Sequence, residues 1–187
     1  MKKKIFSLIC GFLTLTMLTG CTNNSITENN NDLNDEASNT KGNCTVVECI
    51  EKINPENTVE EINNIIGFEG ELTDEKYNKY YWELAEDTGV EVSYYSGTKG
   101  TIRINYDRDS LANKKVDFSR YDELKPKISE GVTYQEFISY IGGVEGTTIE
   151  KSSYSTKYVW VDEDGSYLNG SFSNSSGKCT LASGMIR

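Results

Sequence analysis

The sequence contains no histidine among its 187 residues. Histidine is the side chain whose ordinary pKa lies nearest to neutral pH, so its absence removes the commonest general base and most zinc sites. It also removes the Ser/His and Cys/His pairs of nucleophilic enzymes. The carboxylates of Glu60 and Glu61 stand at the start of a predicted helix, where a cap and the helix dipole account for them. The sequence therefore predicts a protein that is not an enzyme and that uses no metal or cofactor.

Positively charged residues are scarce, with 19 lysines and arginines against 29 aspartates and glutamates and a formal net charge of −10. An acidic surface disfavours nucleic acid and peripheral contact with anionic lipid. Short basic pairs such as Lys114-Lys115 lack the interleaved aromatic residues of a nucleic-acid surface. The charge balance therefore predicts that the chain binds no nucleic acid, and it permits a basic protein partner of unknown identity, although most such charge is solvated surface.

A long hydrophobic run is also missing, because the most apolar stretch extends only from Ile5 to Leu18. It follows three lysines at positions 2–4 and is too short and interrupted for a membrane span. The tetrapeptide Leu18-Thr19-Gly20-Cys21 ends it, and this pattern resembles the lipobox of bacterial lipoprotein signals. An ordinary secretory signal or an N-terminal anchor helix is the alternative interpretation.

The resemblance to a lipobox implies that residues 1–20 are a signal peptide and that Cys21 carries a diacylglyceryl group. The chain would then face away from the cytoplasm on the cell membrane, held there by its lipid anchor alone. Residues 21–43 follow as the lipidated cysteine and a tether that is rich in asparagine and poor in apolar side chains. Such a segment cannot bury enough surface to offset its chain entropy, so we expect a flexible spacer of about 25 Å.

Five cysteines are present, of which Cys10 lies in the signal peptide and Cys21 is the lipidation site. The other three are Cys44, Cys49 and Cys179, and disulfides persist outside the cytoplasm. One disulfide among these three would leave one thiol free. The residues alone leave the pairing open, and we expect a structural role for them.

Two stretches of the chain share one pattern, Thr58–Gly67 and Thr133–Gly142. Each begins with Thr-x-x-Glu, continues with apolar residues at helical spacing and stops at glycine. This pattern predicts a helix with a capping box at its start and a left-handed cap at its end. Each stretch is followed by a Tyr-x-Trp motif. The ordered match predicts an internal repeat, with residues 44–117 as the first copy and 118–187 as the second.

Hydrophobic periodicity predicts one more helix ahead of each capped helix and three strands after it. Pro55 and Pro126 are expected to end the first helix of each pair. The predicted fold is α+β, with two tandem helix–helix–three-strand repeats and an antiparallel sheet that has the helices on one face. The added helices are expected at Thr45–Ile53 and Ser119–Lys125, and the strands at Tyr77–Leu84, Val90–Tyr95, Thr101–Asp107, Ser155–Val161, Ser166–Ser173 and Lys178–Ser183.

Alternation along the strands indicates which side chains face the helices. The side chains at one set of alternate strand positions are apolar, and this parity is assigned to the core. Tyr80 and Trp82 are placed with it, although a shift of one residue would reverse that assignment. The opposite parity is polar with scattered tyrosines, and we expect it on the open face of the sheet. The predicted core set is Val90, Val92, Tyr94, Ile102, Ile104, Tyr106, Leu168, Phe172, Cys179 and Leu181.

The stretches Gly131–Phe137 and Lys157–Trp160, within a tandem of such units, resemble the beta-lactamase inhibitory protein family. They are also similar to the small outer-membrane assembly lipoproteins, which carry a single unit of this kind. The resemblance implies a curved sheet whose concave face binds another protein. It transfers no inhibitory residue to this chain.

Tyrosine offers wide contact area at low entropic cost, so the open face is the predicted protein-binding surface. The expected function is that of a membrane-anchored lipoprotein that binds an envelope or extracellular protein. The alternative is a structural or cell-wall-associated envelope lipoprotein without inhibitory activity. The candidate binding residues are Tyr81, Glu83, Tyr95, Arg103, Tyr167 and Asn169.

Replacing Cys21 with alanine tests the lipid anchor. No thioether can form without the sulfur, so Cys21→Ala is expected to release the protein from membranes on cell fractionation and to abolish its labelling by palmitate. Cys10→Ala, within the predicted signal peptide, is the matched control and should leave both readouts unchanged. Continued membrane retention and labelling of the Cys21→Ala protein would contradict lipidation.

Overall fold

The computed structural model of the chain describes residues 41–95, 99–112 and 116–187. These residues belong to one compact unit, which spans Ser38–Arg187. The predicted signal peptide, the lipidation site Cys21 and most of the predicted tether lie outside the described residues.

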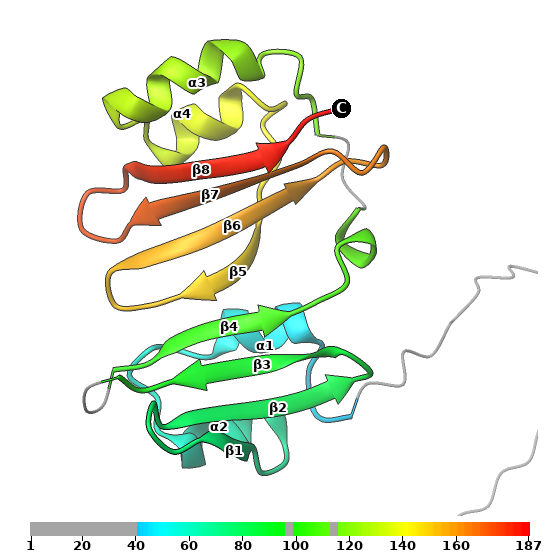
Figure 1. Ribbon diagram of the computed structural model, residues 1–187, viewed down its shortest axis with the longest axis vertical. Helices are drawn as coiled ribbons and strands as arrows, with labels where there is room; N and C mark the ends of the chain where they lie inside the picture. Colours follow the sequence, from blue (N-terminus) through cyan, green and yellow to red (C-terminus); the bar gives the residue numbers. More distant parts are fainter. Residues whose placement is uncertain (1–40, 96–98, 113–115) are drawn as a thin grey trace, which may run out of the picture. The chain divides into compact units, whose positions relative to one another are not determined.

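Eight antiparallel strands form one continuous sheet, and their order across the sheet is their order along the chain (Figure 1). Each inner strand therefore pairs with the strand before it and the strand after it. The strands are β1 (Glu71–Asp74), β2 (Lys79–Ala85), β3 (Thr88–Ser93), β4 (Thr101–Asn105), β5 (Thr147–Lys151), β6 (Ser155–Val161), β7 (Tyr167–Ser173) and β8 (Cys179–Met185).

The predicted fold class is wrong, because the structure has a single eight-stranded sheet in place of two helix–helix–three-strand repeats. Strands β1 and β5 occupy segments whose sequence predicts polar loops. They are four and five residues long and carry charged side chains, so they give no clear apolar–polar alternation. With β5 in place, β4 pairs with it, and this pairing joins the strands on either side into one sheet.

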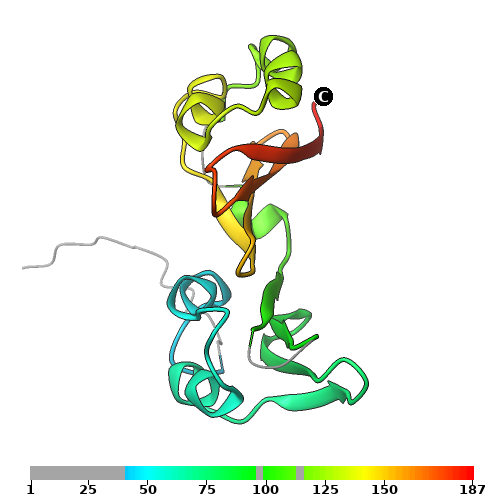
Figure 2. The same cartoon turned by 90° about the vertical axis from the view of Figure 1, so that its left-hand side faces the viewer.

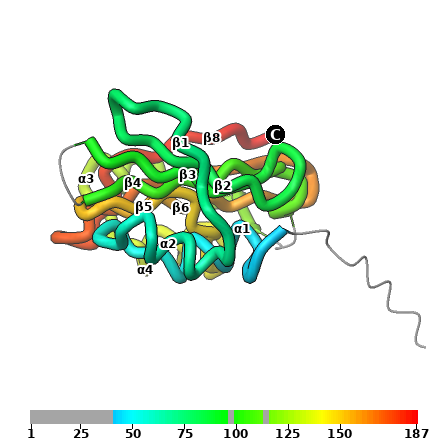
Figure 3. The backbone as a smooth tube through the Cα atoms, turned by 90° about the horizontal axis from the view of Figure 1, so that it is seen from below, coloured from blue at the N-terminus to red at the C-terminus, as the bar shows by residue number. Residues whose placement is uncertain are grey.

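Short helices accompany the sheet, and α1, α2 and α4 lie on one side of the strands (Figure 2, Figure 3). Helices α2 and α4 begin at Thr58 and Thr133, and each threonine forms a capping box with the glutamate three residues later, which confirms the Thr-x-x-Glu prediction. Helix α1 has the same capping box at Thr45. No described helix is long and apolar enough to cross a membrane. The helices are α1 (Val46–Lys52), α2 (Val59–Ile66), α3 (Tyr121–Glu130) and α4 (Tyr134–Ser139), with a turn of 3-10 helix, η1, at Asp109–Leu111.

Helix α3 runs through Pro126, although the sequence predicts that it ends there. Proline has no N–H, so the helix gives up one hydrogen bond at this position. It continues because Leu124 is fully buried and Ile128 packs against the same core cluster. Gly131 then ends the helix with a left-handed backbone at φ 84°. Burial of the apolar stripe therefore outweighs the lost hydrogen bond.

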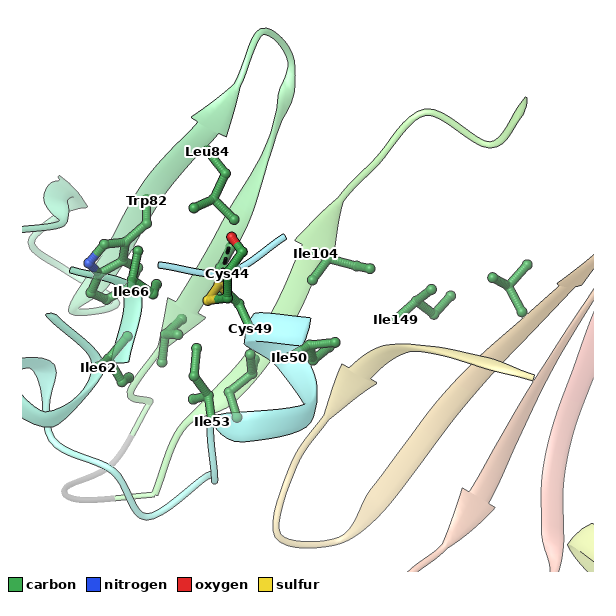
Figure 4. Packing of buried hydrophobic residues seen from close by; sticks show 14 of the residues in the cluster. Cys44, Cys49, Ile50, Ile53, Ile62, Ile66, Trp82, Leu84, Ile104 and Ile149 are labelled. Atoms are coloured by element: carbon green, nitrogen blue, oxygen red, sulfur yellow. Dashed lines mark hydrogen bonds between the residues drawn. A yellow bond between two sulfur atoms is a disulfide. The ribbon is translucent and has the colours of Figure 1, made fainter. Parts of the chain in front are cut away.

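One apolar cluster packs α1 and α2 against β2, β3 and β4 and continues onto β5 and β6 through Ile149, Val159 and Val161 (Figure 4). Trp82 is fully buried in it and Tyr80 packs against it, as predicted. The ring nitrogen of Trp82 donates to the side-chain oxygen of Asn63 over 2.9 Å. Cys44 and Cys49 form a disulfide within this cluster. Helix α1 begins at Val46 with Thr45 as its cap, so Cys44 lies outside the helix. The disulfide therefore links a residue just before the helix to Cys49 within it.

A second cluster packs α3 and α4 against β6, β7 and β8. Trp160 stacks on Phe137 of α4 with the ring centres 5.0 Å apart, and its ring nitrogen donates to the carbonyl of Val144 over 2.8 Å. The third cysteine, Cys179, is a buried free thiol in this cluster. Burial raises the pKa of this thiol, as is typical of a structural cysteine.

The residues assigned to the core are buried or packed against a core cluster as predicted, with one exception. Leu181 is 62% exposed instead of buried. The register shifts between Cys179, which pairs with Phe172, and Leu181, which pairs with Ser171, so a bulge reverses the parity along β8. Ala182 packs against the second cluster in place of Leu181.

Strands β4 and β5 meet over a short pairing, in which Ile102 pairs with Lys151 and Arg103 pairs with Glu150. A helix C-terminus carries unpaired carbonyls and partial negative charge, so a lysine beside it is favourable. Lys151 meets this requirement at the end of α1. Its ammonium donates over 3.0, 3.2 and 3.2 Å to the carbonyls of Ile50, Glu51 and Ile53.

We expect Lys151→Met to lower the free energy of unfolding by about 1.5–3 kcal/mol, the range for hydrogen bonds made by a charged group. Methionine keeps an apolar stem of similar length but leaves the carbonyls of α1 without their donor. Urea unfolding followed by circular dichroism measures the change. Lys157→Met, on the neighbouring strand β6 and on the opposite side of the sheet, is the control and should change the value by less than about 0.5 kcal/mol. Equal losses in both variants would contradict the role of Lys151.

Candidate functional site

The open face of the sheet is the side that α1, α2 and α4 leave uncovered (Figure 3). Directly paired residues point to the same side of a sheet, so the strand register places one residue of each strand in a line across this face. The charges along this line alternate in sign over β3, β4, β5 and β6. The line, termed the open-face row, consists from β2 to β8 of Tyr81, Glu91, Arg103, Glu150, Lys157, Ser171 and Leu181.

Two ion pairs lie on the open face. The Nε atom of Arg103 donates to Oε2 of Glu150 over 2.7 Å, and Nζ of Lys79 lies 3.2 Å from Oε2 of Glu91. The hydrogen bond to Glu150 raises the pKa of Arg103 above its ordinary value. The side chain of Arg103 is 46% exposed, and an ion pair of this exposure adds little to stability. These charges therefore remain available to a partner.

Tyr81 lies against Gly89 of the adjacent strand, where an added Cβ would meet the tyrosine hydroxyl at 2.6 Å. Glycine at this position therefore makes room for the ring on the surface of the sheet. A surface depression of about 470 Å³ adjoins the ring and also includes the candidate residue Glu83. The charged side chains that line it are mostly acidic, namely Asp74, Glu83, Asp87 and Glu91 together with Lys79.

Tyr95 lies beyond the end of β3 and is 59% exposed. Its ring pairs with that of Tyr77, with the centres 5.7 Å apart. The ammonium of Lys76 lies 4.8 Å from the centre of the Tyr77 ring. Tyr95 therefore belongs to a separate aromatic pair at one end of the strands.

Tyr167 and Asn169 are half-buried residues of β7. The guanidinium of Arg108 lies over the ring of Tyr167, 3.8 Å from its centre. Leu111 of η1 packs in the same cluster as Tyr167 and Val161. Val161 is the residue of β6 that pairs with Tyr167. The segment that follows β4 therefore covers this end of the open face, and Tyr167 serves packing there.

The structure brings Tyr81, Glu83 and Arg103 to the part of the open face formed by β2, β3 and β4. Tyr95 and Tyr167 lie toward opposite ends of the strands, so the predicted tyrosines do not form one patch. The continuous feature of this face is the alternation of charge along the open-face row.

Sequence reasoning missed Glu91, Glu150 and Lys157 as members of this row. Glu91 aligns with Arg103 through the pairing of β3 with β4. Glu150 and Lys157 join the row only through the pairing of β4 with β5, which neither strand specifies by itself. The opposite charges of Arg103 and Glu150 are the one signal that could have indicated it, because opposite charges favour direct cross-strand pairing.

The described residues include no group of three or more cysteine, aspartate or glutamate side chains placed to hold a metal ion. The largest pKa shifts belong to tyrosines that hold loops in place. Burial raises the pKa of Tyr94 to about 12, and its hydroxyl donates to the carbonyl of Asn57 over 2.7 Å. Burial also raises the pKa of Tyr134, whose hydroxyl donates to Glu145 over 2.5 Å. These shifts accompany structural hydrogen bonds on the helix side of the sheet.

Comparison with known proteins provides no relative from which a function could be transferred. No protein-family model, no curated protein and no solved structure matches the chain. The resemblance to beta-lactamase inhibitory proteins therefore depends on the sequence motifs alone.

The double substitution Arg103→Ala with Lys157→Ala is expected to lower the free energy of unfolding by no more than about 1 kcal/mol. Exposed ion pairs contribute about 0.2–1 kcal/mol, and Glu150 keeps contact with water when its partner is removed. Urea unfolding measures the change. Ile102→Ala, next to Arg103 but fully buried, is the comparison and should cost about 2–5 kcal/mol. A loss of that size in the surface variant would instead show that the open-face row contributes substantially to the stability of the fold.

Proposed function

We propose that the protein is an exported lipoprotein, anchored to the cell membrane through Cys21, whose sheet binds another protein on its open face. The motif Leu18-Thr19-Gly20-Cys21 supports the anchor. The disulfide between Cys44 and Cys49 supports export, because disulfides persist outside the cytoplasm. A tether between the anchor and the compact unit would let the unit meet a partner away from the membrane surface.

The observation that carries the binding proposal is the alternation of charge along the open-face row. Glu91, Arg103, Glu150 and Lys157 stand side by side on four adjacent strands. Exposed ion pairs contribute little to the fold, whereas complementary charges select a protein partner and accelerate its association. Tyr81 at the β2 end adds a side chain of the type that is enriched in protein interfaces.

The resemblance to beta-lactamase inhibitory proteins makes a secreted enzyme such as a beta-lactamase one candidate partner. Inhibition of a purified beta-lactamase by the protein tests this candidate directly. The covering of the β7 end of the face, where Arg108 lies over Tyr167, favours a second candidate function. Because this covering reduces the surface open to a partner protein, the second candidate is a structural or cell-wall-associated lipoprotein.

Affinity capture from envelope extracts tests the open face. The compact unit, residues 38–187, is immobilised as the wild type and as two variants. One variant reverses charge on the open-face row, Arg103→Glu with Lys157→Glu. The control reverses two exposed lysines elsewhere, Lys52→Glu with Lys76→Glu, and so has the same net charge.

We expect the wild type and the control to capture the same partner. The row variant should bind that partner at least about tenfold more weakly, a loss of about 1.4 kcal/mol. Its two new glutamates would face the negative charges of the partner that Arg103 and Lys157 attract in the wild type. Equal affinity of all three proteins for the captured partner would exclude the open-face row as the binding surface.

A further inference from the structure

Two tyrosines of the strands lie on the open face, and their surroundings differ. The guanidinium of Arg108 lies over the ring of Tyr167 on β7, 3.8 Å from its centre. Tyr81 lies across the face on β2, and no cation of the described residues lies over its ring. Within the part of the chain that the structure describes, the same face thus has one ring covered by an arginine and one uncovered ring.

The ring of Tyr81 leans over β3 and borders a depression. An added Cβ at Gly89 of β3 would lie 2.6 Å from the tyrosine hydroxyl and 2.7 Å from Cζ, so the ring occupies the space above the glycine. Tyr81 is half-buried and lines the depression of about 470 Å³ described above, termed the Tyr81 depression. Part of its electron-rich ring is therefore open to the depression, and such a ring attracts cations.

Negative charge surrounds this ring. Glu71 of β1 pairs directly with Tyr81 and so points to the same side of the sheet. The carboxylates that line the Tyr81 depression are Asp74, Glu83, Asp87 and Glu91. A cation that enters the depression relieves the mutual repulsion of these groups, so the depression favours a positively charged ligand.

The cations on this part of the open face are already paired. Lys79 lines the depression, and its Nζ lies 3.2 Å from the carboxylate of Glu91. Arg103 of β4 is paired with the carboxylate beside it on β5. The carboxylates of Glu83 and Asp87 form no hydrogen bond or ion pair with another described residue. These two carboxylates are therefore the charges left for a ligand.

An organic cation fits this arrangement better than a metal ion. No three carboxylates of the described residues are placed to hold a metal ion. A guanidinium, in contrast, stacks on an aromatic ring and donates to carboxylates at its edge at the same time. Arg108 over Tyr167 shows this stacking on the same face. The surroundings of Tyr81 thus have the chemistry that recognises an arginine side chain.

We propose that the Tyr81 depression binds an arginine side chain of the protein partner, with the guanidinium over the ring and with Glu83 and Asp87 as its acceptors. The inference rests on the proposed function, because it names one side chain of the partner that the open face binds. Glu91 belongs to both the depression and the open-face row, so the two binding regions are continuous. Charge complementarity selects a cation, and the ring favours arginine over lysine.

Titration of short peptides into the full chain in detergent micelles tests this proposal. The probes are Gly-Gly-Arg-Gly-Gly with blocked termini, the same peptide with lysine at its centre, and the same peptide with citrulline, which keeps the shape of arginine without its charge. The tyrosines of the protein are replaced by 3-fluorotyrosine, and the fluorine resonance of Tyr81 is the one that is missing from Tyr81→Phe. Each titration therefore reports the affinity at this ring.

We expect the arginine peptide to shift the Tyr81 resonance and to bind at least about fivefold more tightly than the citrulline peptide, with the lysine peptide between them. Glu83→Gln with Asp87→Asn should weaken the arginine peptide by about the same factor, because both acceptor charges are removed. Asparagine suits position 87, where φ is 56°. The control, Glu56→Gln with Glu60→Gln, changes the net charge equally at the start of α2 and should leave the affinity unchanged.

Failure of this inference and failure of the proposed function give different results. Arg103→Glu with Lys157→Glu leaves the depression intact and should still bind the arginine peptide. Equal affinity for the arginine and citrulline peptides would overturn the inference even when a partner is captured. Unchanged affinity of Glu83→Gln with Asp87→Asn, or a lysine peptide that binds more tightly than the arginine peptide, would also overturn it. A bound arginine peptide together with no captured partner would support the depression as an arginine site and count against the proposed function.

Discussion

The short pairing of β4 with β5 is the contact on which the rest of the sheet depends. Only Ile102–Lys151 and Arg103–Glu150 define its register. Lys151 strengthens the junction because its ammonium donates to the last carbonyls of α1, a helix from the other end of the chain. Arg103 and Glu150 pair on the opposite face. The same four residues therefore join the strands and align the charges of the open-face row.

The open-face row follows from this continuity. The open-face row crosses the junction, and half of its charged residues come from each side of it. A continuous antiparallel sheet has two edges and two faces, and here the helices cover one face while short, charged β1 protects one edge. The other face is the surface on which the open-face row lies.

Local chemistry made part of this fold predictable. The capped helices could be read from Thr-x-x-Glu, because the threonine and glutamate satisfy amides within the same turn. The core parity of most strands followed from alternation. The prediction that Leu181 lies in the core was wrong, because a bulge on β8 that the sequence does not signal turns this side chain to the other face of the sheet. The prediction that α3 ends at Pro126 was wrong, because burial of Leu124 outweighs the one hydrogen bond that proline removes.

The candidate site was less predictable than the fold, because it depends on contacts between distant segments. Tyr81 and Arg103 could be placed on the open face from parity within one strand. The alignment of Arg103 with Glu150 and the covering of Tyr167 by Arg108 both require knowing which strands are neighbours. Without that knowledge the tyrosines suggested a single patch that the structure does not contain.

The most direct test of one continuous sheet uses the two tryptophans, Trp82 and Trp160, which lie in the two different core clusters. Incorporation of 5-fluorotryptophan gives each cluster its own fluorine resonance in one sample. Urea unfolding followed by both resonances should show coincident midpoints, because strands joined through β4 and β5 unfold together. Separate midpoints for Trp82 and Trp160 would contradict a single cooperative sheet.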